Sequence, residues 1–409
     1  MTLDNVASSA PRRGTRPRNR RTLIVAAAAD LFFQRGFDQI GMSDIADAVS
    51  IGPSALYRHF SGKQDLLYEV IRDGLAPIRG VVESLDLRDR KAALSRLAGL
   101  ALDRRQLGVL WQREARQLSG DNRELIRAEV RAIGRLVADR VRVARPDLPG
   151  PATVLLGWAL LSVFSSSSFH HLNLPRAQYE ELLSELFATV LDSPVAEIYG
   201  ERPAGLSASG ISPRSRREAL LAKAIQMFAD HGYMGVGIED IGAAVGIAGP
   251  SIYNHFPTKR DLLVTALERA AAVLFMDLAA VYADAADPAE ALSGLIRSYV
   301  EFTMQHHGVV GLMITEQEHL PERLRATSRQ TQHDYVSEWV QLYLELNPDQ
   351  DPIAARIRIQ AALSIANDLA RTPRLRLVGL EETVGAICRR LLMDDQQVRS
   401  VKAPGSRSS

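Results

Sequence analysis

The sequence contains a single cysteine, Cys388, among its 409 residues. One cysteine cannot form a disulfide within the chain, which excludes a disulfide-stabilised secreted scaffold and fits a reducing compartment. Cys388 lies in an amphipathic helical pattern, where a buried thiol is the usual interpretation. We therefore expect a cytoplasmic protein with this thiol in its core.

Long hydrophobic runs are also lacking. The longest run, from Val154 to Phe164, is well short of the roughly 18 apolar residues that a membrane span requires. No apolar signal core follows the start of the chain. We expect neither a membrane span nor secretion.

The chain carries almost no net charge, because 49 lysines and arginines balance 48 acidic residues to leave a formal charge of +1. Any contact with nucleic acid must therefore depend on local patches. One basic patch occurs near the start, where residues 12–21 include six arginines and no acid. This segment fits a solvated disordered tail as well as an arm that touches DNA.

Signatures of catalysis and metal binding are missing. The sequence has no glycine-rich phosphate loop after a strand, no nucleophile elbow and no pattern of strands. Its adjacent histidine pairs, at 170–171 and 306–307, point about 100° apart on a helix and lack the spacing of metal ligands. The serine-rich run at 165–168 has no nearby base and indicates a small-residue helix surface or a kink. We expect no enzyme activity, no metal and no cofactor.

The sequence does contain an internal duplication. The segment Ser50–Leu67, SIGPSALYRHFSGKQDLL, returns at Gly246–Leu263 as GIAGPSIYNHFPTKRDLL. The matching residues are 246 − 50 = 196 positions apart, and Gly36 and Gly232 keep the same offset. A single repeat of this length indicates two fused units, in agreement with a chain too long for one ordinary core.

Apolar spacing predicts a helical front to each unit. Ile24, Ala28 and Phe32 form one stripe of a first helix that ends at Gly36. Short second and third helices are expected at 42–50 and 53–59, and a fourth from residue 63. Two short helices joined by a tight turn and packed on a longer one form a helix-turn-helix, which places its last helix in the major groove of DNA.

These residues resemble the tetracycline-repressor (TetR) family of bacterial regulators. The family signature extends from the glycine after helix one to a Tyr-x-His-Phe-x-x-Lys-x-x-Leu segment, found here at Tyr57–Leu66 and again at Tyr253–Leu262. The resemblance implies an all-α fold of two fused TetR-like units. It also implies a transcriptional regulator that binds a double-stranded DNA operator, and it favours repression over activation.

The resemblance further implies which residues contact DNA. The tyrosine, histidine and lysine of each signature would touch the DNA backbone, and neighbouring positions of helix three would touch bases. A lysine in the first turn of helix four favours an outside anion, because helix N-termini otherwise prefer acids. The candidates are Arg20, Arg21, Ser43, Pro53, Ser54, Ala55, Tyr57, Arg58, His59, Lys63, Arg216, Arg217, Pro250, Ser251, Tyr253, Asn254, His255 and Lys259.

The two units differ in helix three. The triplet Gly-Pro-Ser at 52–54 recurs at 249–251, an offset of 249 − 52 = 197, so we expect this helix to start one residue later in the second unit. Arg58 also aligns with Asn254, and arginine favours guanine whereas asparagine favours adenine. The hypothesis is that one chain recognises two unequal half-sites.

Larger helical regions follow each front unit as ligand and pairing domains. Their last two helices, expected at 152–170 with 177–191 and at 352–370 with 381–393, are long enough for a four-helix interface. Such helices pair two subunits in the family, so we expect an intrachain pseudo-dimer, with a further homodimer left open. The expected parts are arm 1–19, DNA-binding domains 20–67 and 213–263, ligand and pairing domains 68–192 and 264–395, linker 193–212 and tail 396–409.

The effector pocket is the least defined part. Aromatic and methionine stripes on helices are more often plain core, but an apolar cavity would imply a small hydrophobic effector. The candidate lining residues are Trp111, Glu114, Trp158, Phe302, Met313 and Trp339.

Three positions depart from the family pattern. Ser50 replaces a glycine that the second unit keeps as Gly246, and Gly41 and Gly237 replace a threonine whose hydroxyl would reach a phosphate. Two alternative hypotheses therefore stay open. In one, the helix-turn-helix units are remnants in a helical ligand-binding protein or enzyme. In the other, only one of the two units binds DNA.

Overall fold

The computed structural model describes residues 20–197, 199–201, 213–247, 251–375, 377–394 and 397. This part of the chain is almost entirely helical, as the sequence predicts, and it forms two compact units. Unit 1 contains the described residues up to Val81 together with Arg104–Ile133, and unit 2 contains the rest. The units cut across the two sequence repeats, because helices α4 and α7 each pass from one unit to the other.

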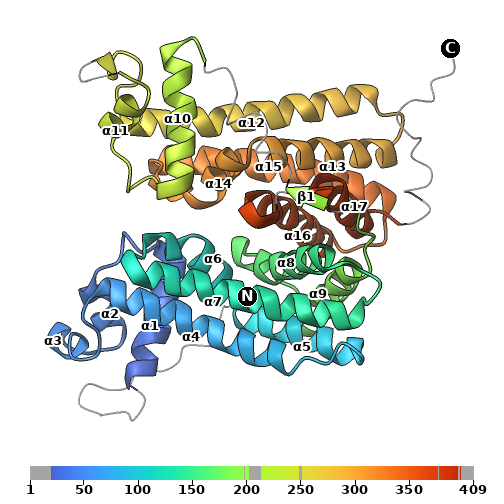
Figure 1. Cartoon of the computed structure of the whole chain (residues 1–409), viewed down its shortest axis with the longest axis horizontal. Coiled ribbons are helices and arrows are strands. Elements are labelled where there is room, and N and C mark those ends of the chain that lie inside the picture. The colour runs from blue at the N-terminus through green and yellow to red at the C-terminus, as the bar shows by residue number, and fades with distance from the viewer. Residues whose placement is uncertain are drawn as a thin grey trace, which may run out of the picture. The chain divides into compact units, whose positions relative to one another are not determined.

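The first helix of unit 1 follows the predicted apolar stripe. Helix α1 (Arg20–Arg35) buries Ile24, Ala28 and Phe32 and ends at Gly36, whose φ of 83° is in the left-handed region. The later helices that lie in unit 1 or begin there are α2 (Met42–Ala48), α3 (Pro53–Leu56), α4 (Lys63–Glu83), α6 (Leu107–Gln112), η1 (Glu114–Gln117) and α7 (Gly120–Ala144) (Figure 1).

Unit 2 holds two parts of the first repeat, Val82–Asp103 and the residues from Gly134 on, and all described residues of the second. From the first repeat it takes α5 (Arg90–Asp103), α8 (Gly150–Ser166), η2 (Ser167–Phe169) and α9 (Arg176–Leu191). From the second it takes α10 (Arg216–His231), α11 (Ile238–Ala244), α12 (Lys259–Asp284), α13 (Pro288–Gln305), α14 (His307–Thr315), η4 (Gln317–His319), α15 (Glu322–Leu346), α16 (Pro352–Arg371), η5 (Pro373–Leu375) and α17 (Leu380–Leu392).

Helices α8 and α9 pack against α16 and α17 within unit 2 (Figure 1). All four lie close to the bounds expected for the pairing helices. The segment Gly150–Phe169 is long and apolar enough to cross a membrane, but most of it is buried. An all-round apolar helix that is covered in this way is a core helix of a folded domain.

The duplication extends beyond the helix-turn-helix units. Arg123 at the start of α7 donates to the carbonyls of Arg116 and Leu118, and Arg325 at the start of α15 donates to two carbonyls of the turn before it. The two arginines are 325 − 123 = 202 positions apart, as are the first residues of α7 and α15, 322 − 120 = 202. The helical regions that follow the front units are therefore also copies, shifted by 202 − 196 = 6 residues from the register of the front units.

The structure corrects the expectation that the chain has no strands. β1 (Tyr199–Glu201) in the linker pairs antiparallel with β2 (Leu377–Val378) before α17. Nearby, the Ala196 N–H donates to Thr383 Oγ1 at 3.0 Å. Strands this short show no period of two, so the sequence pattern missed them. The described part of the linker is thus fixed to the second half, and residues 202–212 lie outside the described residues.

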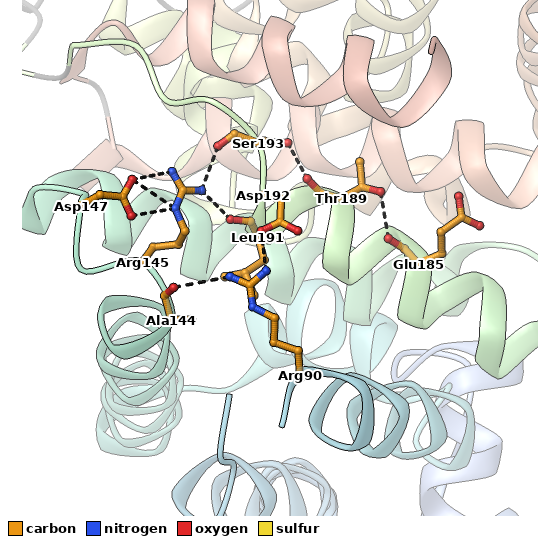
Figure 2. Close-up of polar contacts among 9 residues, drawn as sticks. All are labelled: Arg90, Ala144, Arg145, Asp147, Glu185, Thr189, Leu191, Asp192 and Ser193. Atoms are coloured by element: carbon orange, nitrogen blue, oxygen red, sulfur yellow. Dashed lines mark hydrogen bonds and ion pairs between the residues drawn. The ribbon is translucent and has the colours of Figure 1, made fainter. Parts of the chain in front are cut away.

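Two arginines fix the end of α9 (Figure 2). Arg145 donates to the carbonyls of Leu191 at 2.8 Å and Ser193 at 3.4 Å. Arg90 pairs with Asp192 at 2.7 Å. Cations at a helix C-terminus satisfy its last carbonyls and oppose its dipole. These contacts fix where the linker leaves the first half.

Cys388 is buried in α17, with its Sγ 3.6 Å from the Ala362 carbonyl oxygen. Burial raises the pKa of this thiol to about 12, so it stays protonated at neutral pH. The predicted buried thiol is confirmed.

Candidate nucleic-acid interface

A residue in the left-handed conformation turns the chain between helices two and three of each helix-turn-helix unit, the first unit in the first repeat and the second unit in the second. Ser50 has a φ of 54° and its counterpart Gly246 a φ of 71°. The turn closes in the same way in both, through Ile51 N–H to Ala46 O at 2.9 Å and Ile247 N–H to the equivalent carbonyl at 2.8 Å. The first unit therefore makes the turn with a residue that has a Cβ, which strains it.

Replacing Ser50 with glycine should stabilise the first helix-turn-helix unit. We expect Ser50→Gly to raise its free energy of unfolding by about 1 kcal/mol, because the left-handed conformation is unfavourable for a residue with a Cβ. Gly246→Ser should lower the stability of the second unit by a similar amount, since a Cβ there meets open space and adds only conformational strain. Chemical denaturation measures both changes. An S50G chain no more stable than the unmodified chain would contradict the strain.

The signature side chains separate into a buried and an exposed set. In the first unit Leu56 and Phe60 are buried, whereas Tyr57 is 55% exposed and both Arg58 and His59 face solvent. Phe60 is therefore a core residue, at 1% exposure. An exposed tyrosine beside an arginine gives a surface suited to a polar, anionic partner.

The second unit repeats this separation. Ile252 and Phe256 are buried, Tyr253 is 45% exposed, Asn254 is exposed and His255 is half-buried. Most of the remaining described candidates are accessible as well. Ser43, Pro53, Ser54, Ser251, Arg21, Arg216 and Arg217 are exposed, Arg20 and Ala55 are half-buried, and Pro250 lies outside the described residues. Their contacts with DNA stay a prediction.

The turn that follows helix three has the same register in both units. Phe60 N–H donates to Leu56 O at 3.1 Å, and Phe256 N–H donates to Ile252 O at 3.0 Å. Both pairs fit the common offset, 256 − 60 = 196. The structure shortens the predicted helix, since α3 ends at Leu56 and the chain turns from there toward α4. The expected shift concerns residues 249–251, of which only the last is described.

Lys63 bonds inside its own domain. Its Nζ donates to the carbonyls of Phe37 at 2.8 Å and Ile40 at 3.0 Å and lies 4.1 Å from the centre of the Phe37 ring. Lys259 makes the same contacts, to Tyr233 O at 2.8 Å, to one further carbonyl of the turn and to the Tyr233 ring. Burial lowers the pKa of both lysines.

These lysines therefore hold helix four to the turn between helices one and two. The sequence analysis missed this role, because the partners are backbone carbonyls and not a motif. Contact of Lys63 and Lys259 with phosphate stays a prediction beside it.

A buried carboxylate from the helical region that follows each front unit bonds the same turn. Phe37 N–H donates to Glu114 at 2.9 Å, and Tyr233 N–H donates to Glu316 at 3.3 Å. The two glutamates are copies in the ligand-domain register, 316 − 114 = 202, and both are buried. In each half, helix four thus bonds the carbonyls of the turn, and the glutamate from the later helical region accepts one of its N–H groups.

An arginine in the first turn of helix one, Arg21 or Arg217, stacks on the buried phenylalanine of its unit. Arg21 lies 4.7 Å from the centre of the Phe60 ring and pairs with Glu69 at 2.8 Å. Arg217 lies 4.0 Å from the centre of the Phe256 ring. Stacking orients a guanidinium while one edge stays accessible to solvent.

Two of the candidate pocket residues, both in the second half, lie beside a buried tyrosine. Trp339 and Phe302 are buried near Tyr299, whose ring centre is 5.8 Å from Trp339 and 6.4 Å from Phe302. Tyr299 was not among the candidates, although it lies one helical turn before Phe302. Its hydroxyl donates to Asn367 at 2.9 Å, and burial raises its pKa. Trp111, Trp158 and Met313 are half-buried.

Comparison with known proteins matches the two front units to one family. Residues 24–70 and 220–266 match the family described as "Bacterial regulatory proteins, tetR family". Residues 285–371 match the "Tetracyclin repressor-like, C-terminal domain".

Curated relatives of the chain are transcriptional regulators. The repressor KstR2 of Mycolicibacterium smegmatis is 33% identical over 117 residues, 27% of this chain and 57% of the relative. The activator FasR of the same species is 30% identical over 130 residues, 31% of this chain and 59% of the relative. The chain thus spans a little over half the length of these relatives.

Among solved structures, that of the ketosteroid transcriptional regulator KstR2 of Mycobacterium tuberculosis is 23% identical, with a TM-score of 0.40, and the match covers 44% of this chain and 94% of that one. The duplicated helix-turn-helix geometry and the two family matches lead to the same conclusion. Both front units belong to the TetR family of bacterial regulators, so the chain carries the family's DNA-binding unit twice.

Proposed function

We propose that this protein is a transcriptional repressor in which a single chain recognises two unequal half-sites of a DNA operator. The observation that carries the proposal is the repeated exposed surface of helix three, with Tyr57 and Arg58 in one unit and Tyr253 and Asn254 in the other. Repression follows the KstR2 relatives. The alternative is activation, since the FasR relative is a transcriptional activator.

The two halves act as the two subunits of an intrachain pseudo-dimer in the cytoplasm. The packing of α8 and α9 on α16 and α17 supports this arrangement, because paired helices of this kind form a four-helix interface. The linker strand β1 supports it further, since it is fixed to β2 of the second half.

A small hydrophobic effector releases the DNA. The buried aromatic group around Tyr299 provides an apolar region for such a ligand in the second half. An effector can shift the protein away from DNA only by binding the released conformation more tightly. Glu114 and Glu316 would carry that shift, because each bonds the ligand domain to the turn that positions the helix-turn-helix.

Selection of bound sequences from random DNA tests the unequal half-sites. The unmodified chain should select two different half-sites, one with a guanine preference set by Arg58 and one with an adenine preference set by Asn254. Arg58→Asn should make the selected half-sites more alike, with guanine discrimination weakened by about 1–3 kcal/mol. A strict palindrome selected by the unmodified chain would contradict the proposal.

A further inference from the structure

A buried arginine in α16 places a positive charge where the helices of the two halves pack together. Arg358 is 7% exposed, and it donates to Glu185 of α9 at 2.8 Å and to the Leu391 carbonyl at 3.3 Å. Arg358 belongs to the second half and Glu185 to the first, so this ion pair joins the halves within unit 2. Glu185 lies on α9 in line with Thr189, whose hydroxyl donates to the Glu185 carbonyl (Figure 2).

The duplication shows what stands at the matching place on the other side. Helices α8 and α16 begin 352 − 150 = 202 positions apart, which aligns Leu156 with Arg358, 358 − 156 = 202. Seven buried residues of α9 recur in α17 at a constant offset, from 380 − 179 = 201 to 392 − 191 = 201. That offset aligns Glu185 with Ala386, 386 − 185 = 201. The ion pair therefore has an uncharged counterpart, Leu156 and Ala386.

We propose that this one-sided ion pair makes the two halves select each other, so that the second half of one chain does not pair with the second half of another. The inference rests on the proposed pseudo-dimer and adds its specificity. In a symmetric pair of second halves each Arg358 would face Ala386 and find no carboxylate. A buried charge that has lost its partner is strongly unfavourable, which disfavours that pairing by about 100- to 1,000-fold.

Loss of its partner costs the arginine more free energy than it costs the glutamate, so the arginine contributes most of this selection. The Glu185 side chain is 56% exposed and stays hydrated without a partner, whereas the Arg358 side chain is 8% exposed. Pairing of two first halves would place Leu156 near a carboxylate that can turn to water, a weaker penalty. The linker reinforces the same choice, because Ala196 bonds Thr383 of the second half.

Moving the carboxylate from α9 to α17 tests the selection in the full chain. The variant Glu185→Ala/Ala386→Glu gives each second half its own carboxylate, which meets Arg358 only when two second halves pair. Light scattering should show twice the mass of the unmodified chain, and native mass spectrometry of a mixture of isotopically light and heavy chains should show mixed particles. The matched control, Glu185→Ala alone, should keep the unmodified mass and lower the Tm.

Two outcomes would overturn the selection. One is an exchanged variant with the mass and Tm of the unmodified chain. The other is a Glu185→Ala chain whose Tm is unchanged. If the exchanged variant does not fold, Glu185→Ala/Arg358→Leu decides, since it copies the uncharged side and should regain the Tm lost by Glu185→Ala. No regain would overturn the proposal. Failure of the pseudo-dimer itself would differ, because the unmodified chain would then form mixed particles.

Discussion

Replacing Tyr57 and Arg58 together with alanine should weaken binding of the full chain to its operator by about 100- to 10,000-fold. Two half-sites bound by one chain act as linked contacts, and loss of one removes the gain from effective concentration. The matched variant of the second unit, Tyr253→Ala/Asn254→Ala, should cause a loss of the same order. Fluorescence anisotropy on the selected operator, at one fixed salt concentration, measures both.

The control for these variants is Met276→Ala. Met276 is 73% exposed on α12 and outside the helix-turn-helix units, so its loss should leave operator affinity unchanged. A loss of affinity from only one of the two double variants would contradict recognition of two half-sites. It would instead favour a regulator in which one unit binds DNA and the other only pairs.

Replacing Lys63 with methionine should lower the stability of the first helix-turn-helix unit by about 2 kcal/mol, because two carbonyls lose a charged donor. Lys259→Met should do the same to the second unit, whose bonds have nearly the same lengths. Hydrogen exchange at the amides of each unit in the full chain localises the loss. Unchanged exchange after Lys63→Met would contradict the internal role.

The same variants decide whether the lysines also contact DNA. A phosphate contact contributes to the salt dependence of binding, so its loss should reduce the slope of log affinity against log salt by about 1. A reduced slope would support the contact that the family resemblance implies. An unchanged slope with lower stability would assign Lys63 to the internal bonds alone.

The sequence predicted the fold where a local pattern decides it. The apolar stripe of Ile24, Ala28 and Phe32 and the glycine stop after it are local, and the structure confirms both. The duplication provides a second copy of the front unit, in which the first helix has the same apolar stripe and the same glycine stop. Helices α8, α9, α16 and α17 were predictable for the same reason, since they are long and amphipathic or apolar.

The bonds around the interface were not predictable, because their partners are distant backbone groups. Lys63 reaches a carbonyl 26 positions away, and Glu114 accepts an N–H 77 positions away. No side-chain motif marks such a backbone partner. The pairing of Arg358 with Glu185, 173 positions apart, likewise needed the packing of α9 on α16 to become visible. The exposure of Tyr57 followed from the family resemblance and not from its apolar character.

The number of chains on one operator tests the central claim most directly. Native mass spectrometry of the purified chain with the selected operator, at protein concentrations near the dissociation constant, gives this number. The account predicts one chain on a duplex that contains two unequal half-sites, with both half-sites protected in a footprint. Two chains on that duplex, each protecting one half-site, would contradict it.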